Sequence, residues 1–216
     1  PYIPKWEVEE AKELVNELKV KYEIVEVPII DEIKNNPEDR CYLCKKAVFS
    51  MIQDIAKKEG YDYVIDGTNF DDIGDYRPGL KALGELEVKS PLLECKLTKN
   101  EIRSLSKELG LNTWDKPPYA CLLTRIPYGN ELKIQDFEKI EEAEKHMMSI
   151  GFRAVRVRCH GNLARIEVDR KDRSKLLNEK LLDEIAIKLK EIGFKYISMD
   201  LEGYRVGSFN ETMKSK

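Results

Sequence analysis

The stretch from residue 112 to residue 132 shows neither helical nor strand periodicity, although the sequence on both sides of it does. A stretch of roughly 20 residues without periodicity is uncommon inside a compact domain and usually forms a functional loop or a connection between domains. The whole chain has 216 residues, enough for one large domain or two modest ones. We therefore predict two domains, residues 1–126 and residues 127–216.

Helical and strand-like patterns alternate in the first predicted domain. Residues 5–19 carry apolar side chains at helical spacing, and residues 24–30 form a short apolar run that predicts a strand. The sequence Asn-Asn-Pro-Glu-Asp at 35–39 is a helix-start signal, which predicts a helix ending at Gly60. Residues 63–65 then predict a compact buried strand, and this order of elements predicts an α/β fold.

A capping box, Thr98-Lys-Asn-Glu101, predicts a further helix that closes at Gly110. The second predicted domain has a different pattern: a helix over 134–150, two alternating runs around Gly161-Asn162, another helix, and a last strand at 196–201. Helix, hairpin, helix and strand in this order predict a smaller α+β module.

Two cysteines three positions apart, Cys41 and Cys44, open the second predicted helix and therefore share one face of it. With Cys121 from the aperiodic stretch, they could form a three-thiol site for a [4Fe-4S] cluster that leaves one iron open. The spacing alone also allows another metal or redox role, or inert thiols; structural zinc usually needs four ligands, and redox pairs of this kind follow a strand. The remaining two cysteines, Cys95 and Cys159, lie on apolar runs and are predicted to be small buried thiols.

An acidic loop follows the predicted strand at 63–65. It begins with Asp66-Gly67-Thr68-Asn69 at a strand-to-loop junction, which is where open α/β sheets bind ligands. Its four carboxylates and one arginine could hold Mg²⁺ and the phosphates of a nucleotide; these residues are Asp66, Asp71, Asp72, Asp75 and Arg77. An acidic surface loop rich in turn residues would have the same composition.

Arginines alternate on the first strand of the predicted hairpin. Arg156 and Arg158 face opposite to Val155 and Val157, because side chains of a strand alternate between its two faces. Together with Arg125 they could converge on an anionic ligand, but a solvated strand face would show the same pattern. Taken alone, Glu144 would belong to a solvated helix face.

Composition excludes several classes of protein. Charged residues make up 36% of the chain but almost cancel, with a net charge of −3, so tight binding of nucleic acid is not expected. No apolar run approaches the ~20 residues that cross a bilayer. Five cysteines, an odd number, and the lack of a secretory leader predict cytoplasmic thiols.

Taken in order along the chain, these segments resemble the LarE family of ATP-dependent sacrificial sulfur transferases, and the resemblance runs from residue 1 to the C-terminus. The matching motifs are Arg40-Cys-Tyr-Leu-Cys-Lys45, Asp66-Gly-Thr-Asn69, Asp75-Tyr-Arg-Pro-Gly79, Cys121 with Arg125-Ile-Pro-Tyr-Gly129, Val155-Arg-Val-Arg158 and Asp200-Leu-Glu-Gly-Tyr-Arg205. The specific signal is the ordered series at family spacing rather than any single motif.

The resemblance implies a Rossmann-like, three-layer ATP-pyrophosphatase domain of the adenine nucleotide alpha-hydrolase type, N-terminally incomplete, and a smaller α+β C-terminal domain. It also implies a step in nickel-pincer nucleotide biosynthesis. In that step ATP adenylylates a carboxylate of pyridinium-3,5-biscarboxylic acid mononucleotide, and sulfur replaces the activated oxygen to give a thiocarboxylate. Because members of the family form trimers and hexamers, the resemblance further implies a homo-oligomer.

Two types of sulfur donor occur in the family. Some members donate the sulfur of one loop cysteine, whereas others carry three cysteines and a [4Fe-4S] cluster whose open iron is thought to hold a sulfide. This sequence matches the three-cysteine pattern, so the resemblance implies that Cys41, Cys44 and Cys121 are catalytic and bind the cluster. For Cys121 the roles of ligand and donor both stay open.

The resemblance also implies roles for residues outside the cysteine motif. The residues that would bind ATP with Mg²⁺ are Asp66, Gly67, Thr68, Asn69, Asp75 and Arg77. The residues that would bind anionic groups, such as the phosphate or carboxylates of the substrate, are Arg125, Arg156 and Arg158. Glu144 matches a family position near a metal and a subunit contact.

One departure from the family concerns its Ser-Gly-Gly-x-Asp-Ser pyrophosphate loop, which these 216 residues do not contain. Such a loop supplies the backbone N–H groups that bind pyrophosphate. The sequence could be a portion of a longer one, the gene product could lack the loop, or a separate polypeptide could supply it. The alternatives to the sulfur transferase are a cluster-dependent tRNA thiolase, which the charge balance disfavours, and a non-catalytic iron–sulfur or nucleotide-binding relative.

Overall fold

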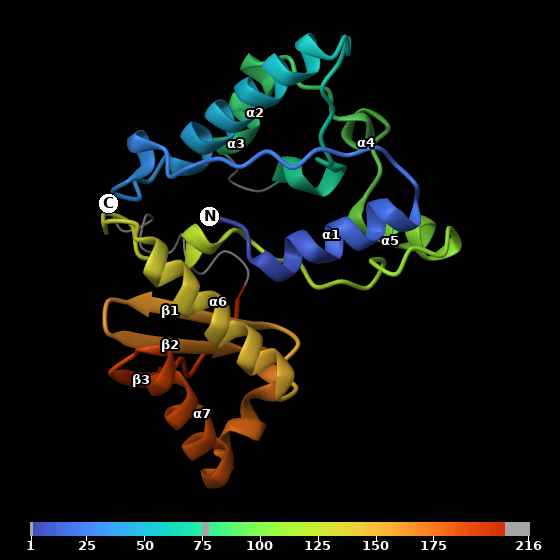
Figure 1. Ribbon diagram of the computed structural model, residues 1–216. Helices are drawn as coiled ribbons and strands as arrows, with labels where there is room; N and C mark the ends of the chain where they lie inside the picture. Colours follow the sequence, from blue (N-terminus) through green and yellow to red (C-terminus); the bar gives the residue numbers. More distant parts are fainter. Residues whose placement is uncertain (1, 75–77, 206–216) are drawn as a thin grey trace. The chain divides into compact units, whose positions relative to one another are not determined.

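The computed structural model describes residues 2–74 and 78–205 (Figure 1). Within these residues the protein is a mixture of helices and strands with one small sheet. The chain forms two compact units: Val27–Pro118 makes one of them, and Pro1–Glu26 together with Tyr119–Lys216 makes the other. In the described part of the chain, no helix combines the length and the apolar character that crossing a membrane would require.

The unit Val27–Pro118 consists mainly of helices. Its α-helices are α2 (Arg40–Lys58), α3 (Pro78–Glu85), α4 (Pro91–Glu94) and α5 (Lys99–Glu108), and its 3₁₀ helices are η1 (Asp31–Ile33) and η2 (Phe70–Gly74). Helices α2 and α3 pack against each other, and α3 buries Gly79, Ala82 and Leu83. The predicted helix that opens with the cysteine pair and the predicted capping box of α5 are both confirmed, because each depends on local signals.

Two predicted strands in this part of the sequence are wrong. Residues 24–30 have no strand hydrogen bonding in the described structure, and residues 63–65 make only a single parallel bridge, between Ile65 and Lys89. The side chain of Ile65 is 64% exposed, so this segment is also not buried. An apolar run favours extended backbone, but a strand also needs a neighbouring backbone with which to pair.

The other unit contains the sheet. Its strands are β1 (Val155–His160), β2 (Leu163–Val168) and β3 (Tyr196–Met199); β1 and β2 form an antiparallel hairpin, and β3 pairs with β2 in parallel. The hairpin turns at Gly161, whose φ of 64° lies in the left-handed region that favours glycine. The predicted hairpin and last strand are therefore confirmed.

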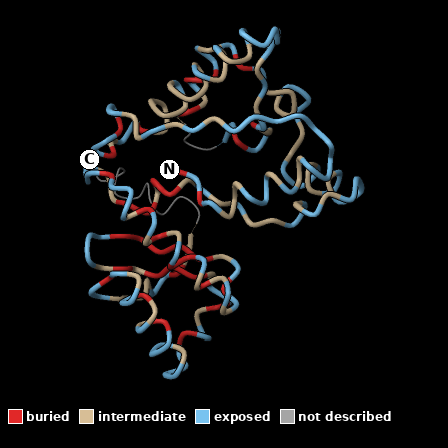
Figure 2. The backbone as a smooth tube through the Cα atoms, viewed as in Figure 1, coloured by how far each residue is buried: buried red, intermediate tan, exposed pale blue. Residues whose placement is uncertain are grey.

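Helices of this unit pack against its sheet. The helices of the unit are α1 (Lys5–Glu17), η3 (Leu122–Arg125), α6 (Ile134–Ser149), η4 (Arg170–Leu177) and α7 (Glu179–Ile192), of which α6 and the 3₁₀ helix η3 pack against β1 and α7 against β3 (Figure 1). The fully buried side chains include Ile140 and Met147 of α6 and Leu189 of α7. Figure 2 shows that buried residues are concentrated in the hairpin and in the helix faces turned toward it.

The N-terminal segment belongs to the same compact unit as the C-terminal part. The N–H of Leu122 donates to the carbonyl of Tyr2 at 2.8 Å, and the indole of Trp6 packs edge-on against the ring of Tyr119 with centroids 4.7 Å apart. The compact units thus differ from the predicted domains 1–126 and 127–216, because they place residues 1–26, with α1, and residues 119–126, with η3, in the same unit as the sheet. The predicted domains describe the organisation of the family fold and stay a prediction.

Replacement of Thr98 by alanine should destabilise the unit Val27–Pro118 without changing its fold. The Thr98 hydroxyl accepts the N–H of Glu101 at 3.3 Å, while the Glu101 carboxylate accepts the N–H of Thr98 at 2.8 Å. Losing such a cap lowers the free energy of unfolding by about 1 kcal/mol. Urea denaturation followed by circular dichroism measures the change, and an unchanged midpoint would show that the cap does not contribute.

Candidate functional site

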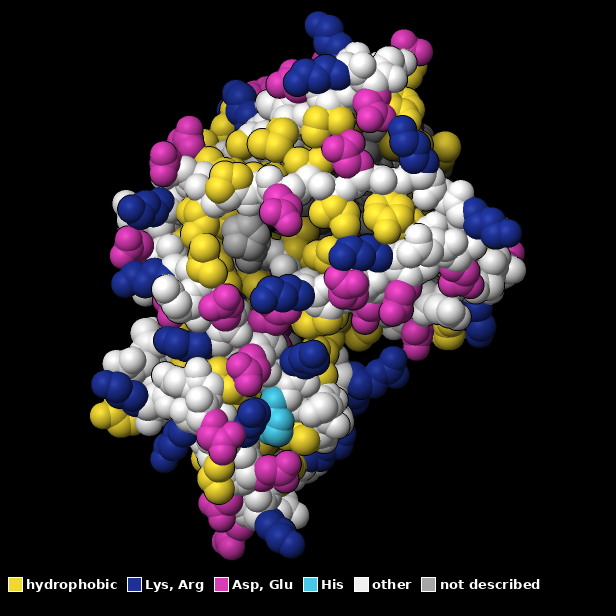
Figure 3. Space-filling model, in the orientation of Figure 1, with side chains coloured by type: hydrophobic (Ala, Val, Ile, Leu, Met, Phe, Trp, Pro, Cys, Tyr) yellow, Lys and Arg dark blue, Asp and Glu magenta, His cyan; other side chains and the backbone are white. Residues whose placement is uncertain are grey.

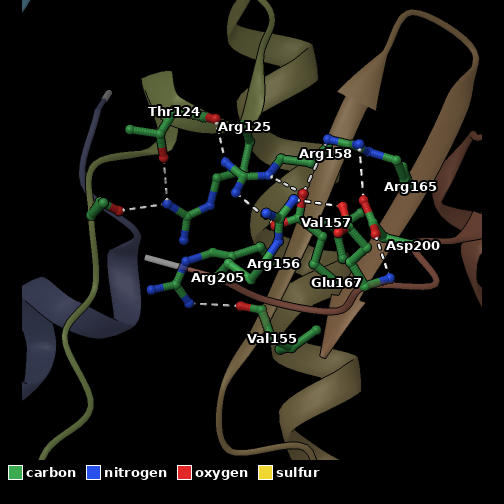
Figure 4. A network of polar contacts seen from close by, with 12 residues as sticks. Thr124, Arg125, Val155, Arg156, Val157, Arg158, Arg165, Glu167, Asp200 and Arg205 are labelled. Atoms are coloured by element: carbon green, nitrogen blue, oxygen red, sulfur yellow. Dashed lines mark hydrogen bonds and ion pairs between the residues drawn. The ribbon is translucent and has the colours of Figure 1, made fainter. Parts of the chain in front are cut away.

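Buried arginines lie around the start of the hairpin and the 3₁₀ helix η3 (Figure 4). The exposed fractions are 0% for Arg125, 3% for Arg156 and 5% for Arg158. The sequence allowed two interpretations of the strand face that carries Arg156 and Arg158, an anion site or a solvated surface. The solvated surface is wrong, because both side chains are buried. Alternation along a strand sorts side chains into two faces, but it cannot tell whether the second face is also covered.

The most deeply buried ion pair of this region joins Arg125 to Glu144. Nε and Nη2 of Arg125 donate to the two carboxylate oxygens of Glu144 at 2.8 and 2.9 Å, a bidentate geometry. Nη1 of the same arginine donates to the carbonyls of Ala120 at 2.8 Å and Cys121 at 3.2 Å, and Glu144 also accepts the N–H of Val157 at 2.9 Å. One pair thus connects α6, β1 and the residues before η3.

The charge of Arg125 is maintained by its partner. Burial by itself would lower the pKa of Arg125, but the Glu144 carboxylate outweighs burial and the net shift is upward. Cys121 makes a smaller contribution in the same direction to the pKa of Arg125.

A second bidentate pair links the two strands of the hairpin. Nε and Nη2 of Arg158 donate to Glu167 at 2.8 and 2.7 Å, and Nη1 donates to the carbonyl of Thr124 at 2.6 Å. The hydroxyl of Thr124 accepts from Nη1 of Arg125 at 2.8 Å, so Thr124 contacts both arginines. Arg165 also contacts Glu167: its Nη2 lies 3.1 Å from Oε1 of Glu167. Nη1 of Arg165 lies 3.0 Å from Oδ2 of Asp200.

The third arginine, Arg156, lies against two tyrosines. Its guanidinium carbon is 4.9 Å from the ring centroid of Tyr119 and 4.8 Å from that of Tyr204, and Nη1 donates to the carbonyl of Val155 at 2.7 Å. Burial, reinforced by repulsion from Arg125, lowers the pKa of Arg156. An anion in contact with this guanidinium would offset both effects.

The cysteines of the predicted cluster site come from both compact units. Cys41 and Cys44 lie in the first turns of α2 and are half-buried, while Cys121, also half-buried, immediately precedes η3 in the other unit; none of the three forms a disulfide. Within either unit, the described residues contain no group of three or more Cys, His, Asp and Glu side chains that could hold a metal. A three-thiol site would therefore need both units, and it stays a prediction.

The other two cysteines differ from each other. Cys159 is buried, as predicted, and burial raises its pKa to about 11. The prediction that Cys95 is buried is wrong, because this residue is exposed directly after the short helix α4. The helix α4 is only four residues long, Pro91–Glu94, and buries none of its own residues.

The acidic loop is held together by hydrogen bonds to its carboxylates. Asp66 accepts the hydroxyl of Ser90 at 2.6 Å, and it accepts both the N–H of Thr68 at 3.2 Å and its hydroxyl at 2.5 Å. Burial by itself would raise the pKa of Asp66, but the hydrogen bonds from Ser90 and Thr68, with a smaller contribution from the Lys45 ammonium, lower it. Asp66 is therefore a carboxylate at neutral pH.

The rest of the loop is ordered in the same way. Asp72 accepts the N–H of Asn69 at 3.1 Å, and Asp71 accepts the N–H of Lys99 at 2.8 Å. Within the loop, Thr68 thus contacts Asp66, whereas Asn69 contacts Asp71 and Asp72; their predicted role in binding a nucleotide stays a prediction. Asp75 and Arg77, which the sequence placed near the nucleotide phosphates, lie outside the described residues.

Several residues of these sites were missed by reasoning from the sequence. Glu167 could have been found, because the predicted hairpin turn at Gly161-Asn162 fixes the register that pairs Arg156 with Glu167. Ser90, Thr124 and Tyr119 carry no comparable signal. Their contacts join segments that only the tertiary structure brings together.

Acidic and basic side chains are interspersed on the surface. On the face of the described residues that Figure 3 shows, lysines and arginines alternate with aspartates and glutamates rather than gathering in one basic patch. This distribution agrees with the net charge of −3. It gives no support to a nucleic-acid interface on that face.

Comparison with known proteins gives three relatives that match over most of the chain. An uncharacterized protein of Synechocystis sp. is 38% identical over 212 residues, which cover 96% of this chain and 78% of that protein. An uncharacterized protein of Methanocaldococcus jannaschii is 42% identical over 205 residues, which cover 95% and 78%. The pyridinium-3,5-bisthiocarboxylic acid mononucleotide synthase of Lactiplantibacillus plantarum is 39% identical over 183 residues, which cover 85% and 66%. No model of a protein family matches the sequence.

Replacement of Glu144 by glutamine should strongly destabilise the unit that contains the sheet, because it leaves the Arg125 charge buried without its carboxylate. Breaking a buried ion pair from one side costs about 3–5 kcal/mol. Glu142→Gln on the same helix is the matched control, since Glu142 is exposed and pairs only loosely with Lys188 at 3.7 Å. Chemical denaturation measures both variants, and equal stability of the two would contradict a structural role for the pair.

Asp66 should make stability depend on pH in the acidic range. Because its pKa is lowered in the folded state, it stabilises the fold above its ordinary pKa of 3.8, and this contribution is lost as the pH falls through the lowered value. Asp66→Asn should therefore be less stable than the natural chain at pH 7, with a difference that shrinks toward pH 3. Denaturation curves across this range measure it, and a difference independent of pH would argue against the assignment.

Proposed function

The chain belongs to the LarE-like family, and we propose that it is a sulfur transferase of nickel-pincer nucleotide biosynthesis. The observation that carries the proposal is its 39% identity, over 85% of the chain, to a pyridinium-3,5-bisthiocarboxylic acid mononucleotide synthase. The chain spans 66% of the length of that synthase. The substrate we propose is pyridinium-3,5-biscarboxylic acid mononucleotide, a small molecule that carries carboxylates and a phosphate.

The surroundings of Arg156 support an anionic substrate. Arg125 and Arg158, in the same compact unit, are each engaged by a buried carboxylate, Glu144 and Glu167. Arg156 instead has a guanidinium whose charge is disfavoured by burial and by its neighbour Arg125. A phosphate or carboxylate would relieve this repulsion, and the planar guanidinium suits such groups. The same unit places Cys121 beside Arg125, so the proposed anion site and a sulfur atom belong to one neighbourhood.

The proposed reaction has two steps. First, a substrate carboxylate oxygen attacks the α-phosphorus of ATP and pyrophosphate leaves, with Mg²⁺ neutralising the phosphates. Then a sulfur nucleophile attacks the activated carbonyl carbon and AMP leaves with the former carboxylate oxygen. A sulfide gives the thiocarboxylate directly. The thiolate of Cys121 would give a thioester, and loss of its Cα proton with cleavage of its Cβ–S bond would release the thiocarboxylate and leave dehydroalanine. For the first step we propose that Asp66, Gly67, Thr68 and Asn69 line the nucleotide pocket.

The three thiols fit a [4Fe-4S] cluster in their chemistry, since such clusters are held by cysteine thiolates. A bound cluster would supply an iron with an open coordination position and a soft sulfur nucleophile. Cys41 and Cys44 would contribute two thiolates from one helical turn, and Cys121, whose carbonyl accepts a hydrogen bond from Arg125, would contribute the third. Cys121 could equally donate its own sulfur, and its variants separate these roles.

Two further expectations stay predictions. Glu144 was expected near a metal; its carboxylate oxygens accept hydrogen bonds from Arg125 and Val157, which supports a positioning role instead. A trimeric or hexameric assembly is implied by the resemblance to the family alone.

Cysteine variants test the proposed function. Protein purified without oxygen should contain about four irons per chain and should convert the pyridinium substrate to its thiocarboxylate in the presence of ATP and Mg²⁺. Serine at position 41, 44 or 121 should remove the product and most of the iron. The matched control is Cys95→Ser, which should retain both because Cys95 is an exposed thiol outside the site.

The iron content and the product of each variant test different parts of the proposal. Iron without product in the natural chain would contradict the sulfur-transfer function, and product without iron would contradict the cluster. Loss of product in Cys121→Ser with iron retained would make Cys121 the donor rather than a ligand. Product formation by Cys121→Ser would exclude both roles.

A further inference from the structure

Two chain segments of the unit Val27–Pro118 end side by side next to Asp66. The N–H of Asp66 donates to the carbonyl of Lys89 at 2.9 Å, and the N–H of Lys89 donates to the carbonyl of Val64 at 3.0 Å. This parallel pairing brings the residue after each segment to the same edge. Ser90 therefore lies beside Asp66, although the two are distant in sequence.

The hydroxyl of Ser90 is not used in the way its position would suggest. Ser90 is the N-cap residue of α4, and serine at an N-cap usually accepts a backbone N–H of its own helix. Here it makes no such bond, and its hydroxyl donates to Oδ1 of Asp66 at 2.6 Å. Thr98, the N-cap residue of α5, does cap its helix, so the unit contains an ordinary cap for comparison.

Asp66 is held on both of its oxygens. Oδ1 accepts from Ser90 and from the N–H of Thr68, and Oδ2 accepts from the hydroxyl of Thr68. The Lys45 ammonium of α2 adds a favourable charge. These bonds fix the rotation of the carboxylate, which a free aspartate side chain would not maintain.

We propose that Ser90 is a positioning residue of the nucleotide pocket: its hydroxyl, together with Thr68, holds the Asp66 carboxylate in the orientation that receives the nucleotide. The inference rests on the proposed function, which gives Asp66 its ligand. It assigns a role to the junction of residues 89–91, which lies outside the acidic loop. A carboxylate that is oriented before the ligand arrives loses less conformational freedom on binding.

The first test is the equilibrium affinity for ATP with Mg²⁺, measured by calorimetry on the full chain. Ser90→Ala should weaken binding about tenfold, since it removes a hydrogen bond to a charged group and water replaces only part of that bond. Ser90→Thr keeps the hydroxyl and should bind within about twofold of the natural chain, given the ordinary scatter of measured contributions. Thr98→Ala is the matched control, because it removes a helix cap and stability without touching Asp66.

The second test reads the contact directly and does not depend on ATP. The amide resonance of Thr68, whose N–H donates to Asp66, should shift in Ser90→Ala, return toward its original position in Ser90→Thr, and stay unchanged in Thr98→Ala. An unmoved Thr68 resonance in Ser90→Ala would overturn the inference, whether or not ATP binds.

The two tests together separate the inference from the function on which it rests. If Ser90→Ala shifts the Thr68 resonance and weakens ATP binding, while Ser90→Thr and Thr98→Ala do neither, the result supports the nucleotide pocket and the positioning role of Ser90. If the resonance shifts and ATP affinity does not change, Ser90 orders the carboxylate but does not position it for the nucleotide, and the inference fails. If the natural chain binds no ATP, the result contradicts the proposed nucleotide pocket. The positioning role of Ser90 is then contradicted as well, because it is defined by that pocket.

Discussion

The bidentate ion pair between Arg125 and Glu144 is the contact on which the order of the surrounding residues depends. Its two side chains are 0% and 1% exposed, so neither charge is solvated and each must be satisfied by protein atoms. Arg125 reaches the carbonyls of Ala120 and Cys121, and Glu144 accepts the N–H of Val157. The same pair therefore fixes the segment that carries Cys121 relative to α6 and β1.

Burial of so many charges is better explained by function than by stability. Buried ion pairs seldom stabilise a protein more than apolar residues of the same volume would. Here Thr124 connects the pair Arg125–Glu144 to the pair Arg158–Glu167, and the guanidinium of Arg156 packs against the rings of Tyr119 and Tyr204. We connect this concentration of guanidinium groups with the anionic substrate of the proposed reaction, for which an apolar core would be useless.

The acidic loop follows the same physical principle with weaker donors. Asp66 is kept charged and oriented by hydroxyls of Ser90 and Thr68, just as Glu144 is oriented by Arg125 and a backbone N–H. In the proposed chemistry the two compact units have different tasks. The unit Val27–Pro118 contributes Asp66 and the cysteine pair, and the other unit contributes the arginines and Cys121.

The sequence by itself determined the elements whose signals are local: helices α2, α5, α6 and α7 and the hairpin at Gly161, because caps, turns and helical periodicity act over a few residues. The ordered motifs also determined the family. Only the tertiary structure decided what depends on distant partners. Residues 24–30 lack a strand because no described backbone pairs with them, Arg156 and Arg158 are buried because both faces of β1 are covered, and Ser90 meets Asp66 through parallel pairing. Burial and pairing are set by segments far away in the chain, which no local pattern encodes.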